Sequence, residues 1–382
     1  MLTNADIAEL TDWRRDLHRF PEISGHEVQT AGRVIAALQS CKPDQILTQL
    51  GGHGVAAIWN GAVAGETVLF RAELDALPID EIGTPEWRSQ TQGWGHMCGH
   101  DGHMTILMAL ARLIHRKPPA SGRVILLFQP AEENGTGAAA VLADPRYGDI
   151  KPDWAFALHN MPGLPLGHTT LRSGTMMCAS QGMLIRLTGK TSHASMPETG
   201  ISPVLAITEM IPNLLALGPG GPLTEAFRMV TITHARIGEA AFGIAPGAGE
   251  LWVKLRTRED PPMAAMRADA EAIAQTIATA HGLSLSFETQ DDFSATVNDP
   301  DAITRLTAAL DALHMPHDDR NLPLRGSEDF GRFGGSGTKM AMMFLGSGES
   351  HPQLHNPDYD FPDSLTPIGA RLFQRVMTDI LG

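Results

Sequence analysis

The chain has 382 residues, of which 43% are hydrophobic and 19% are charged. At roughly 150 residues per domain this length allows two or three domains, and the composition argues against a disordered chain, a coiled coil or a collagen-like repeat. Lys and Arg number 29 against 43 Asp and Glu, which gives a formal net charge of −14. Because this charge repels phosphate backbones and anionic membrane surfaces, we expect neither a nucleic-acid partner nor a membrane partner.

The N-terminal segment and the cysteines predict a cytoplasmic protein. Asp6 and Glu9 stand where a secretory signal needs basic and then apolar residues. The longest mostly apolar stretch, 104–114, is interrupted by Thr105 and Arg112 and is too short to span a bilayer. Three cysteines in so long a chain do not make a disulfide framework.

Apolar runs alternate with helical patterns over the first 180 residues. A helix broken near Pro21 is expected over 3–39, and a second helix over 104–115. Continuous apolar runs suit strands that are buried on both faces of a helix-covered sheet. Such runs occur at 55–59, 68–71, 124–128 and 154–158.

The pattern changes after about Ser180. Four further strands are expected at 183–187, 229–235, 250–256 and 283–288, with helices at 203–217 and 262–281 and a loop at 218–222. A helix at 301–313 and a strand at 340–344 then resume the first pattern. The sequence predicts an α/β fold in which a helix-covered mixed sheet is built from 1–180 and 292–382. A smaller α+β domain with a four-stranded sheet and two helices is expected as an insertion at 181–291.

The densest group of metal-binding residue types is the segment His-Met-Cys-Gly-His-Asp-Gly-His at 96–103. A borderline-soft divalent cation favours imidazole and thiolate, so Cys98 and His100 are candidate ligands of one metal. His96 and His103 are weaker candidates. His103 is better suited to support a ligand or to start the following helix.

Other ligand-type residues follow predicted strands. Glu132 and Glu133 come just after 124–128, and His159 ends the strand at 154–158. Asp75 comes soon after 68–71. Ligands gather at the carboxyl ends of strands in open α/β sheets. Neighbouring carboxylates usually point in different directions, so one can bind metal while the other acts as a general base. A solvated acidic turn is the alternative for this pair taken alone.

The Gly/Pro-rich loop at 346–361 contains His351 and His355. Either histidine would supply a remote ligand to close the site, and their spacing alone does not decide between them.

Seven segments together resemble the amidohydrolase/carboxypeptidase family of dinuclear metallopeptidases. The resemblance is to the branch that contains hippurate hydrolases, N-acyl-amino-acid amidohydrolases and indole-acetyl-amino-acid hydrolases. It runs from Asp16 to the C-terminus, and the combination of CGHDGH with QPAEE is highly specific for that branch. The segments are DLHRFPEISGHE, CGHDGH, QPAEE, ALHN, GKTSHAS, SEDF and LHNPDYDF.

The resemblance implies two divalent metal ions per subunit, zinc or manganese, with cobalt or nickel also open. It implies that Glu132 is the catalytic carboxylate and that Asp75 supports the ligands. Two such metals share a bridging hydroxide, and Glu132 would move a proton from the metal-bound water to the leaving amine. The ligands implied are Cys98, His100, Glu133, His159 and His355.

His193, in GKTSHAS, has two interpretations. It is an ordinary turn histidine, or, as the resemblance implies, it reaches a neighbouring subunit's active site and stabilises the tetrahedral oxyanion. The second interpretation predicts a homodimer or higher homo-oligomer and makes the inserted domain a dimerisation and lid domain.

The chain departs from the family pattern at three places. Glu73 replaces the first Asp of the usual Asp-x-Asp, and Gly243 replaces an Asn that usually helps to bind the carboxylate end of the substrate. Ser202-Pro203 replaces the Asp-Pro that follows GKTSHAS. None of these positions is an implied metal ligand, so they bear on substrate choice more than on hydrolysis.

The sequence therefore predicts a metal-dependent amidohydrolase that cleaves the amide of N-acyl amino acids or similar small N-acyl compounds. Arg256 or Arg325 is a candidate acceptor for a substrate carboxylate. An aminopeptidase or dipeptidase is a second hypothesis, in which Glu328 would bind a free α-amine. A catalytically inactive metal-binding or regulatory protein is a third, against which the presence of both Glu132 and Glu133 counts.

Overall fold

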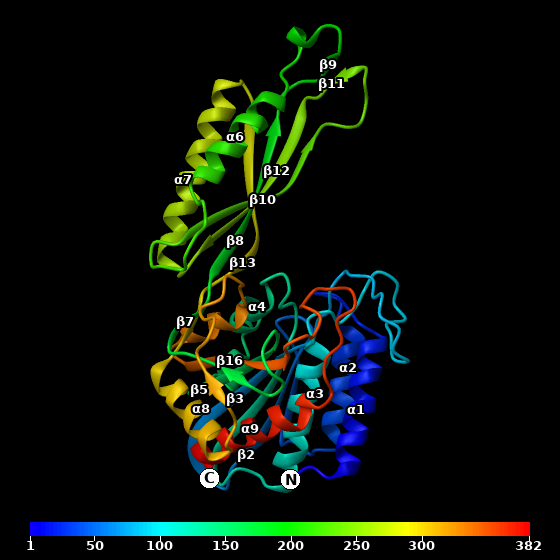
Figure 1. Cartoon of the computed structure of the whole chain (residues 1–382), viewed down its shortest axis with the longest axis vertical. Helices are drawn as coiled ribbons and strands as arrows, with labels where there is room; N and C mark the ends of the chain where they lie inside the picture. Colours follow the sequence, from blue (N-terminus) through cyan, green and yellow to red (C-terminus); the bar gives the residue numbers. More distant parts are fainter. The chain divides into compact units, whose positions relative to one another are not determined.

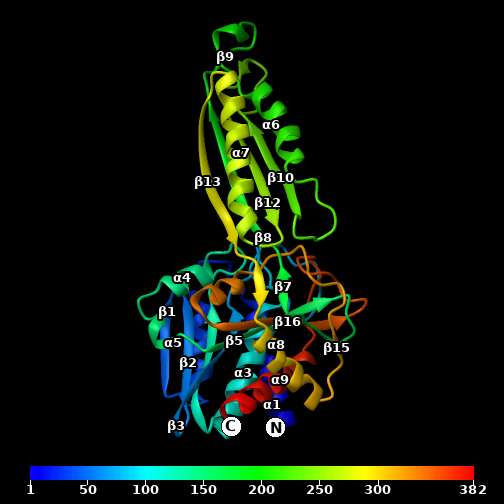
Figure 2. The same ribbon diagram turned by 90° about the vertical axis from the view of Figure 1, so that its left-hand side faces the viewer.

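The computed structural model describes the whole chain apart from the side chain of Ser336. The chain divides into two compact units, each described by itself below (Figures 1 and 2). Unit 1 comprises Met1–Met176, Thr296–Leu322 and Glu328–Gly382. Unit 2 comprises Met177–Ala295 and Pro323–Ser327.

Unit 1 is built on a mixed sheet of eight strands in the order β1-β2-β4-β3-β5-β16-β6-β15. The four central strands β4, β3, β5 and β16 run parallel to one another, and β2 and β1 extend the sheet antiparallel on one side. The parallel strands place their carboxyl ends along one edge of the sheet. The strands are β1 Gln45–Leu50, β2 Gly54–Asn60, β3 Val63–Glu73, β4 Ser121–Gln129, β5 Trp154–Pro162, β6 Thr169–Thr170, β15 His317–Asp318 and β16 Lys339–Gly348.

Helices cover this sheet and bury its central strands. The apolar run at 124–128 in β4 has no exposed surface, as expected for a strand with helices on both faces. Helix α3 packs on α9, α1 and β3, and α8 and α9 both contact β16 (Figure 2). The helices are α1 Asn4–Arg19, α2 Val28–Gln39, α3 His100–Arg116, α4 Gly137–Ala143, α5 Tyr147–Ile150, α8 Pro300–Ala312 and α9 Leu365–Leu381, with the 3₁₀ helix η2 at Asp329–Ser336.

Unit 2 has its own core between a four-stranded antiparallel sheet and two helices. The strand order is β10-β12-β8-β13, and α6 packs on β10 while α7 packs on β8, β12 and β13 (Figure 1). Alternate residues of β12 (Leu251, Val253 and Leu255) are buried in this core. The elements are β8 Ala179–Thr188, β10 Arg228–Ile237, β12 Ala248–Thr257, β13 Ser284–Phe293, α6 Val204–Ala216 and α7 Pro261–Ala280.

Two short pairings complete the strand inventory. In unit 2, β9 (Ser192–His193) pairs with β11 (Ile244–Ala245). Elsewhere β7 (Gly174–Met177) pairs with β14 (Thr296–Asn298). The short 3₁₀ helix η1 lies at Pro197–Thr199.

The predicted fold class is confirmed: a helix-covered mixed sheet carries a second unit of four strands and two helices. Each strand predicted from an apolar run overlaps an observed one. The predicted break near Pro21 separates α1 from α2. The patterns predict neither β1 nor α9. Strand β1 lies at the sheet edge and is mostly exposed or half-buried, so its residues carry little of the apolar signal of a buried strand.

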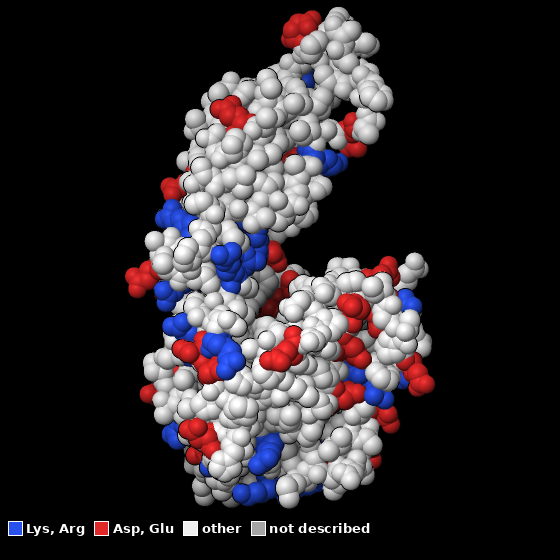
Figure 3. All heavy atoms as spheres, in the orientation of Figure 1, with Lys and Arg blue, Asp and Glu red and all other residues white. Residues whose placement is uncertain are grey.

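The surface is consistent with the acidic composition. Asp and Glu side chains are interspersed with Lys and Arg over the face drawn in Figure 3. No helix among the described residues is long and apolar enough to cross a bilayer.

A buried ionic cluster joins α1 to the start of α3 in unit 1. The Arg14 guanidinium lies 3.1 Å from Asp101, and His18 Nδ1 lies 2.8 Å from the same carboxylate. Burial lowers the pKa of His18, but hydrogen bonds with Asp101 and Glu81 outweigh it and raise the pKa to about 9. His18 is therefore protonated in the folded protein at neutral pH.

This cluster predicts a loss of stability on the alkaline side. An unfolded histidine titrates near 6.5, so the contribution of His18 is fully present below pH 6.5 and is lost as the pH rises towards about 9. We expect the free energy of unfolding to fall by on the order of 3 kcal/mol over this range because of His18. Denaturant unfolding at several pH values checks this. His18→Gln should remove the part of this pH dependence that is due to His18, whereas the exposed His115→Gln should retain it.

Candidate metal centre

The side chains predicted as metal ligands come from segments that meet at the carboxyl edge of the parallel strands. Glu133 follows β4, and His159 lies near the end of β5. Cys98 and His100 lie at the N-terminus of α3, where Gly99 precedes the first helical turn. His355 lies in the loop that follows β16. The topology thus brings residues from 98 to 355 to one place.

Two groups of ligand atoms overlap at this place. Cys98, His100 and His159 form one group whose ligand atoms all lie within 4.8 Å of one another. Cys98, Glu133 and His355 form a second group by the same measure, so the thiol belongs to both. His100 Nε2 lies 3.8 Å from Glu133, and His355 Nε2 lies 3.7 Å from the same carboxylate. The five predicted ligands are therefore close enough to hold more than one cation.

The hydrogen bonds of the two buried histidines direct Nε2 of each ring toward other predicted ligands, and His159 Nε2 lies 3.3 Å from Cys98 Sγ. His100 Nδ1 lies 2.8 Å from the Asp75 carbonyl, and His159 Nδ1 lies 2.8 Å from the Asn160 carbonyl. Each Nδ1 therefore donates its hydrogen, which makes Nε2 the atom that offers a lone pair when the ring is neutral. Burial lowers the pKa of His100, but Asp75, Glu73 and Glu133 outweigh it and raise the pKa to about 10, so a cation at this place would displace a proton from that ring. His100 Nε2 and Glu133 Oε1 are buried without a hydrogen-bond partner among the described residues. Unpaired buried groups of this kind fit a divalent cation between them.

The electrostatics of the site also fit cations. Burial, together with the carboxylates of Glu133 and Glu132, raises the pKa of the Cys98 thiol well above its ordinary value. Burial raises the pKa of Glu133 to about 7, and burial lowers that of His159 well below its ordinary value. The imidazole of His159 is thus neutral, as a metal ligand must be. A divalent cation would reverse the effect on the thiol and stabilise the thiolate.

Glu132 lies beside the ligands and is almost completely buried. One of its carboxylate oxygens is 4.0 Å from His100 Nε2. Burial and the carboxylates of Glu328 and Glu133 raise the pKa of Glu132 well above its ordinary value. This side chain is therefore placed to accept and hold a proton next to the candidate metal centre.

Asp75 joins three parts of the site. Its carboxylate accepts hydrogen bonds from Ser24 Oγ at 2.7 Å and from the Glu133 backbone N–H at 3.0 Å. Its backbone carbonyl fixes the His100 ring. Burial raises the pKa of Asp75, but the interactions with His100, Glu133 and Ser24 outweigh it and hold the pKa below its ordinary value. Asp75 is thus an ionised carboxylate that orients a predicted ligand on either side.

Ligand atoms of Glu73, His100 and His103 also lie within 4.8 Å of one another. Both ring nitrogens of His103 are already used, because Nδ1 lies 2.6 Å from Glu73 and Nε2 accepts the Asn160 N–H at 3.1 Å. Arg71 pairs with Glu73 on its other oxygen. These residues therefore form a supporting hydrogen-bond chain and offer no free lone pair on His103.

Glu328 is buried in an ionic cluster around Arg71. The Arg71 guanidinium lies 2.9 Å from Glu328 and 2.6 Å from Asp329, and it also pairs with Glu73. Oxygens of Glu132, Glu328 and Asp329 lie within 4.8 Å of one another. Among the described residues, the Arg71 guanidinium is the positive charge that pairs with Glu328 and Asp329. The predicted role of Glu328 in substrate binding stays a prediction.

The remaining predicted residues lie in unit 2. His193 is exposed, and its Nδ1 accepts the Ser195 backbone N–H at 3.1 Å, so Nε2 carries the hydrogen of the neutral ring. Gly243 lies next to it, because its carbonyl accepts the Ala194 N–H and Ile244 pairs with His193. The predicted role of His193 as an oxyanion donor stays a prediction.

Arg256 lies on β12, within unit 2. Its Nη1 donates to the Arg325 carbonyl and to Ser327 Oγ, both at 2.8 Å. Burial lowers the pKa of Arg256 below the ordinary value of arginine. Its role as an acceptor for a substrate carboxylate also stays a prediction.

Two supporting features were not predicted. Glu27 is fully buried and accepts the Ala131 N–H at 2.8 Å, which fixes the backbone just before Glu132. Ala131 and His355 have positive φ angles of 51° and 65°, which non-glycine residues rarely adopt. The acidic side chain of Glu27, in the segment FPEISGHE, was the sequence signal available for this supporting role.

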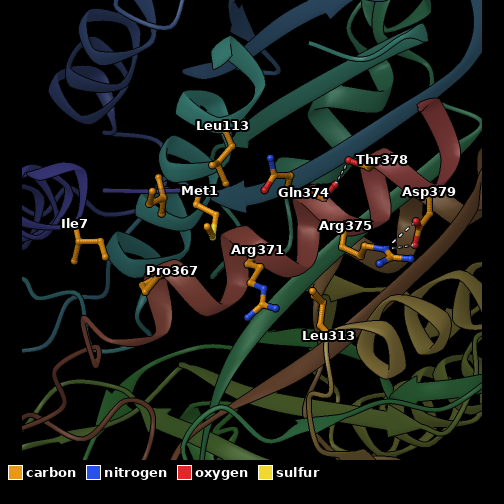
Figure 4. Close-up of a pocket in the computed structure, with 11 residues that line it drawn as sticks. Met1, Ile7, Leu113, Leu313, Pro367, Arg371, Gln374, Arg375, Thr378 and Asp379 are labelled. Carbon is orange, nitrogen blue, oxygen red and sulfur yellow. Dashed lines mark hydrogen bonds and ion pairs between the residues drawn. The ribbon is translucent and has the colours of Figure 1, made fainter. Parts of the chain in front are cut away.

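A cavity of about 590 Å³ lies elsewhere in unit 1, lined mainly by apolar atoms (Figure 4). Its lining includes Leu113 near the C-terminal end of α3 and Arg371 on α9. Leu113 is 13 residues beyond His100 in the same helix, which corresponds to roughly 20 Å along the helix axis. This cavity is therefore separate from the candidate metal centre.

Comparisons with known proteins find relatives that match over nearly the whole chain. N-acetylcysteine deacetylase of Bacillus subtilis is 26% identical over 385 residues, covering 100% of this chain and 99% of that protein. IAA-amino acid hydrolase ILR1-like 5 of Arabidopsis thaliana is 30% identical over 404 residues, covering 100% of this chain and 89% of that protein. A crystal structure of a dinuclear metal-binding peptidase of the M20 family from Bacillus subtilis matches with a TM-score of 0.80. It is 25% identical and covers 99% of both chains.

The family assignment follows from a match that spans most of the sequence. The model of peptidase family M20/M25/M40 matches residues 69–379, which include all five predicted ligands. The fold, the segments of the site and this match lead to one conclusion: the chain belongs to peptidase family M20/M25/M40.

Proposed function

We propose that the protein is a metal-dependent amidohydrolase that cleaves the amide bond of N-acyl amino acids. The products would be a carboxylic acid and a free amino acid. The observation that carries the proposal is the overlap of the two ligand groups at Cys98, with buried unpaired atoms on His100 and Glu133. The deacetylase and the IAA-amino acid hydrolase are each named for hydrolysis of an amino acid conjugate, which supports this substrate class.

Two divalent cations would be held by the five ligands predicted above. The combination of one thiolate with three imidazoles favours zinc, whereas manganese, cobalt or nickel would compete according to supply. Divalent cations at this place would act as Lewis acids toward the amide carbonyl and would make water a stronger acid at neutral pH.

Glu132 would carry the proton in the reaction. Its carboxylate would take a proton from the attacking water and pass it to the nitrogen of the leaving amino acid. Burial beside Glu328 and Glu133 favours the protonated form, so the side chain can hold the proton between the two transfers. Asp75 would keep the His100 ring and the Glu133 backbone in place.

Unit 2 would supply a donor to the oxyanion that forms at the amide and a group that binds the carboxylate of the substrate. The neutral tautomer of His193 directs an N–H outward at Nε2, which suits a donor to the oxyanion. We propose that His193 acts in the active site of a second subunit, which requires a homodimer or a higher homo-oligomer. Unit 2 would then serve as a dimerisation and lid domain.

Arg256 is our candidate for the acceptor of the substrate carboxylate. Burial lowers its pKa, and its guanidinium donates hydrogen bonds to two neutral oxygens. An anionic partner would therefore be favourable. The aminopeptidase alternative depends on a free carboxylate for an α-amine, and Glu328 and Asp329 already pair with Arg71. We therefore prefer the amidohydrolase.

A substrate panel tests the proposal. Hippurate, N-acetyl amino acids, an indole-acetyl amino acid and dipeptides would be given to protein purified without chelator. We expect release of the amino acid from the acylated substrates, its loss after chelation, and its return when zinc or manganese is added. Cleavage of dipeptides alone would contradict the proposal and support the peptidase hypothesis.

A further inference from the structure

The side chain of Asn160 lies where three ligand-bearing segments meet. Its Nδ2 donates to the Cys98 carbonyl at 3.1 Å, and its Oδ1 accepts the Tyr359 hydroxyl at 2.9 Å. Its backbone N–H donates to His103 Nε2 at 3.1 Å. Asn160 and Tyr359 are both fully buried, with no exposed surface.

We propose that the Asn160–Tyr359 pair is a positioning device that sets the spacing of the metal ligands. The inference rests on the metal centre proposed above. Neither side chain is a proposed ligand, and each acts through its neighbours. Asn160 directly follows His159 and holds the carbonyl of Cys98, while Tyr359 is four residues from His355. The pair thus links all three segments.

The geometry at Gly99 shows how closely the amide is fitted. A Cβ at this position would lie 1.9 Å from Asn160 Oδ1 and 3.0 Å from the Tyr359 hydroxyl oxygen. The φ of Gly99 is +87°, a conformation that other residues rarely adopt. The backbone between Cys98 and His100 is therefore shaped to admit the amide of Asn160.

The hydrogen bond from the Asn160 N–H to His103 Nε2 extends this positioning role to α3, the helix that carries His100. His103 lies one turn after His100 on α3, and its Nδ1 is held by Glu73 at 2.6 Å. This bond fixes the tautomer in which Nε2 accepts the Asn160 N–H. Glu73, which replaces the usual Asp, bonds to His103 here and is not itself a proposed ligand.

Removal of one hydroxyl group tests the positioning role apart from any effect on the overall stability of the protein. Tyr359→Phe cuts the link between the His355 loop and Asn160 and leaves every proposed ligand in place. The matched control is Tyr147→Phe, which removes a phenolic hydroxyl from the other tyrosine of the chain. Tyr147 is buried on α5 with its ring against Phe333. A second test variant, Asn160→Asp, keeps the shape but replaces the donor to Cys98.

The readout is cobalt binding to metal-free full-length protein, followed by the near-ultraviolet charge-transfer absorption of a thiolate–cobalt bond. Cys98→Ser identifies the band. Loss of a group that orients a ligand typically costs 10–100-fold in metal affinity. We expect a 10–100-fold weaker affinity and a shifted band in Tyr359→Phe and Asn160→Asp, with wild-type values in Tyr147→Phe.

The possible outcomes are distinct. If wild type shows the Cys98 band and both test variants bind cobalt as tightly as Tyr147→Phe, the positioning role is wrong while the metal centre stands. If one test variant fails to fold, the other decides by the same comparison. If wild type shows no band that depends on Cys98, the proposed metal centre fails, and this inference fails with it.

Discussion

Glu132→Gln should lower kcat for an N-acyl amino acid by about 10²–10⁴-fold, the usual contribution of a general base. The amide has the shape of the carboxylate but cannot accept and return the proton. Glu132 is buried 4.0 Å from His100 Nε2 but is outside the five proposed ligands. We therefore expect the metal content to stay at the wild-type level.

Two controls make this result specific. Glu86→Gln removes an exposed carboxylate and should leave both kcat and metal content unchanged. Glu133→Gln removes a proposed ligand and should lower the metal content itself. Steady-state kinetics together with metal analysis by mass spectrometry measures both quantities. A Glu132→Gln variant that keeps kcat within a few-fold of wild type would show that another group moves the proton.

Arg71→Met should lower the free energy of unfolding by about 3–5 kcal/mol, the usual result of removing one partner from a buried ionic cluster. The guanidinium is fully buried and pairs with Glu73, Glu328 and Asp329. Without it, these carboxylates lose the cation that compensates for their desolvation. They would either take up protons or repel one another, and both outcomes destabilise the fold.

Denaturant unfolding in the presence of chelator measures this effect without a contribution from bound metal. Unit 1 contains five of the six tryptophans, so their fluorescence follows its unfolding. Arg375→Met is the matched control, because it breaks a surface ion pair with Asp379, and exposed ion pairs of this kind contribute little to stability. Equal effects of the two substitutions would contradict the compensating role of Arg71.

Most of the fold could be predicted because its signals are local. The run at 124–128 is apolar at every position, and such a run indicates a buried strand whatever surrounds it. The four strands and two helices of unit 2 carry equally clear periodic patterns. Strand β1 and helix α9 were not predicted. An edge strand needs little apolar surface, whereas the buried residues of α9 recur at helical spacing, a local signal that was present and was missed.

The candidate site also has a part that could be predicted from the sequence and a part that could not. The ligand types Cys98, His100 and Glu133 are visible in short motifs, and the resemblance chooses His355 over His351. Of the residues that hold these ligands, Asp75 was implied by the resemblance, but Asn160 and Tyr359 were not predicted, because their roles exist only through contacts between distant segments. Asn160 and Tyr359 are 199 residues apart, and each has many other uses in a sequence. Hydrogen-bond partners at such separations follow from the fold.

The most direct test of the account is a metal titration of metal-free wild-type protein, with hydrolysis of its best N-acyl amino acid substrate measured at each step. The account predicts that hydrolysis is absent without metal and rises to a plateau as two equivalents of zinc or manganese are bound. Hydrolysis that persists in the metal-free protein, or that reaches its plateau at one equivalent, would contradict a centre in which Cys98 joins two groups of ligands.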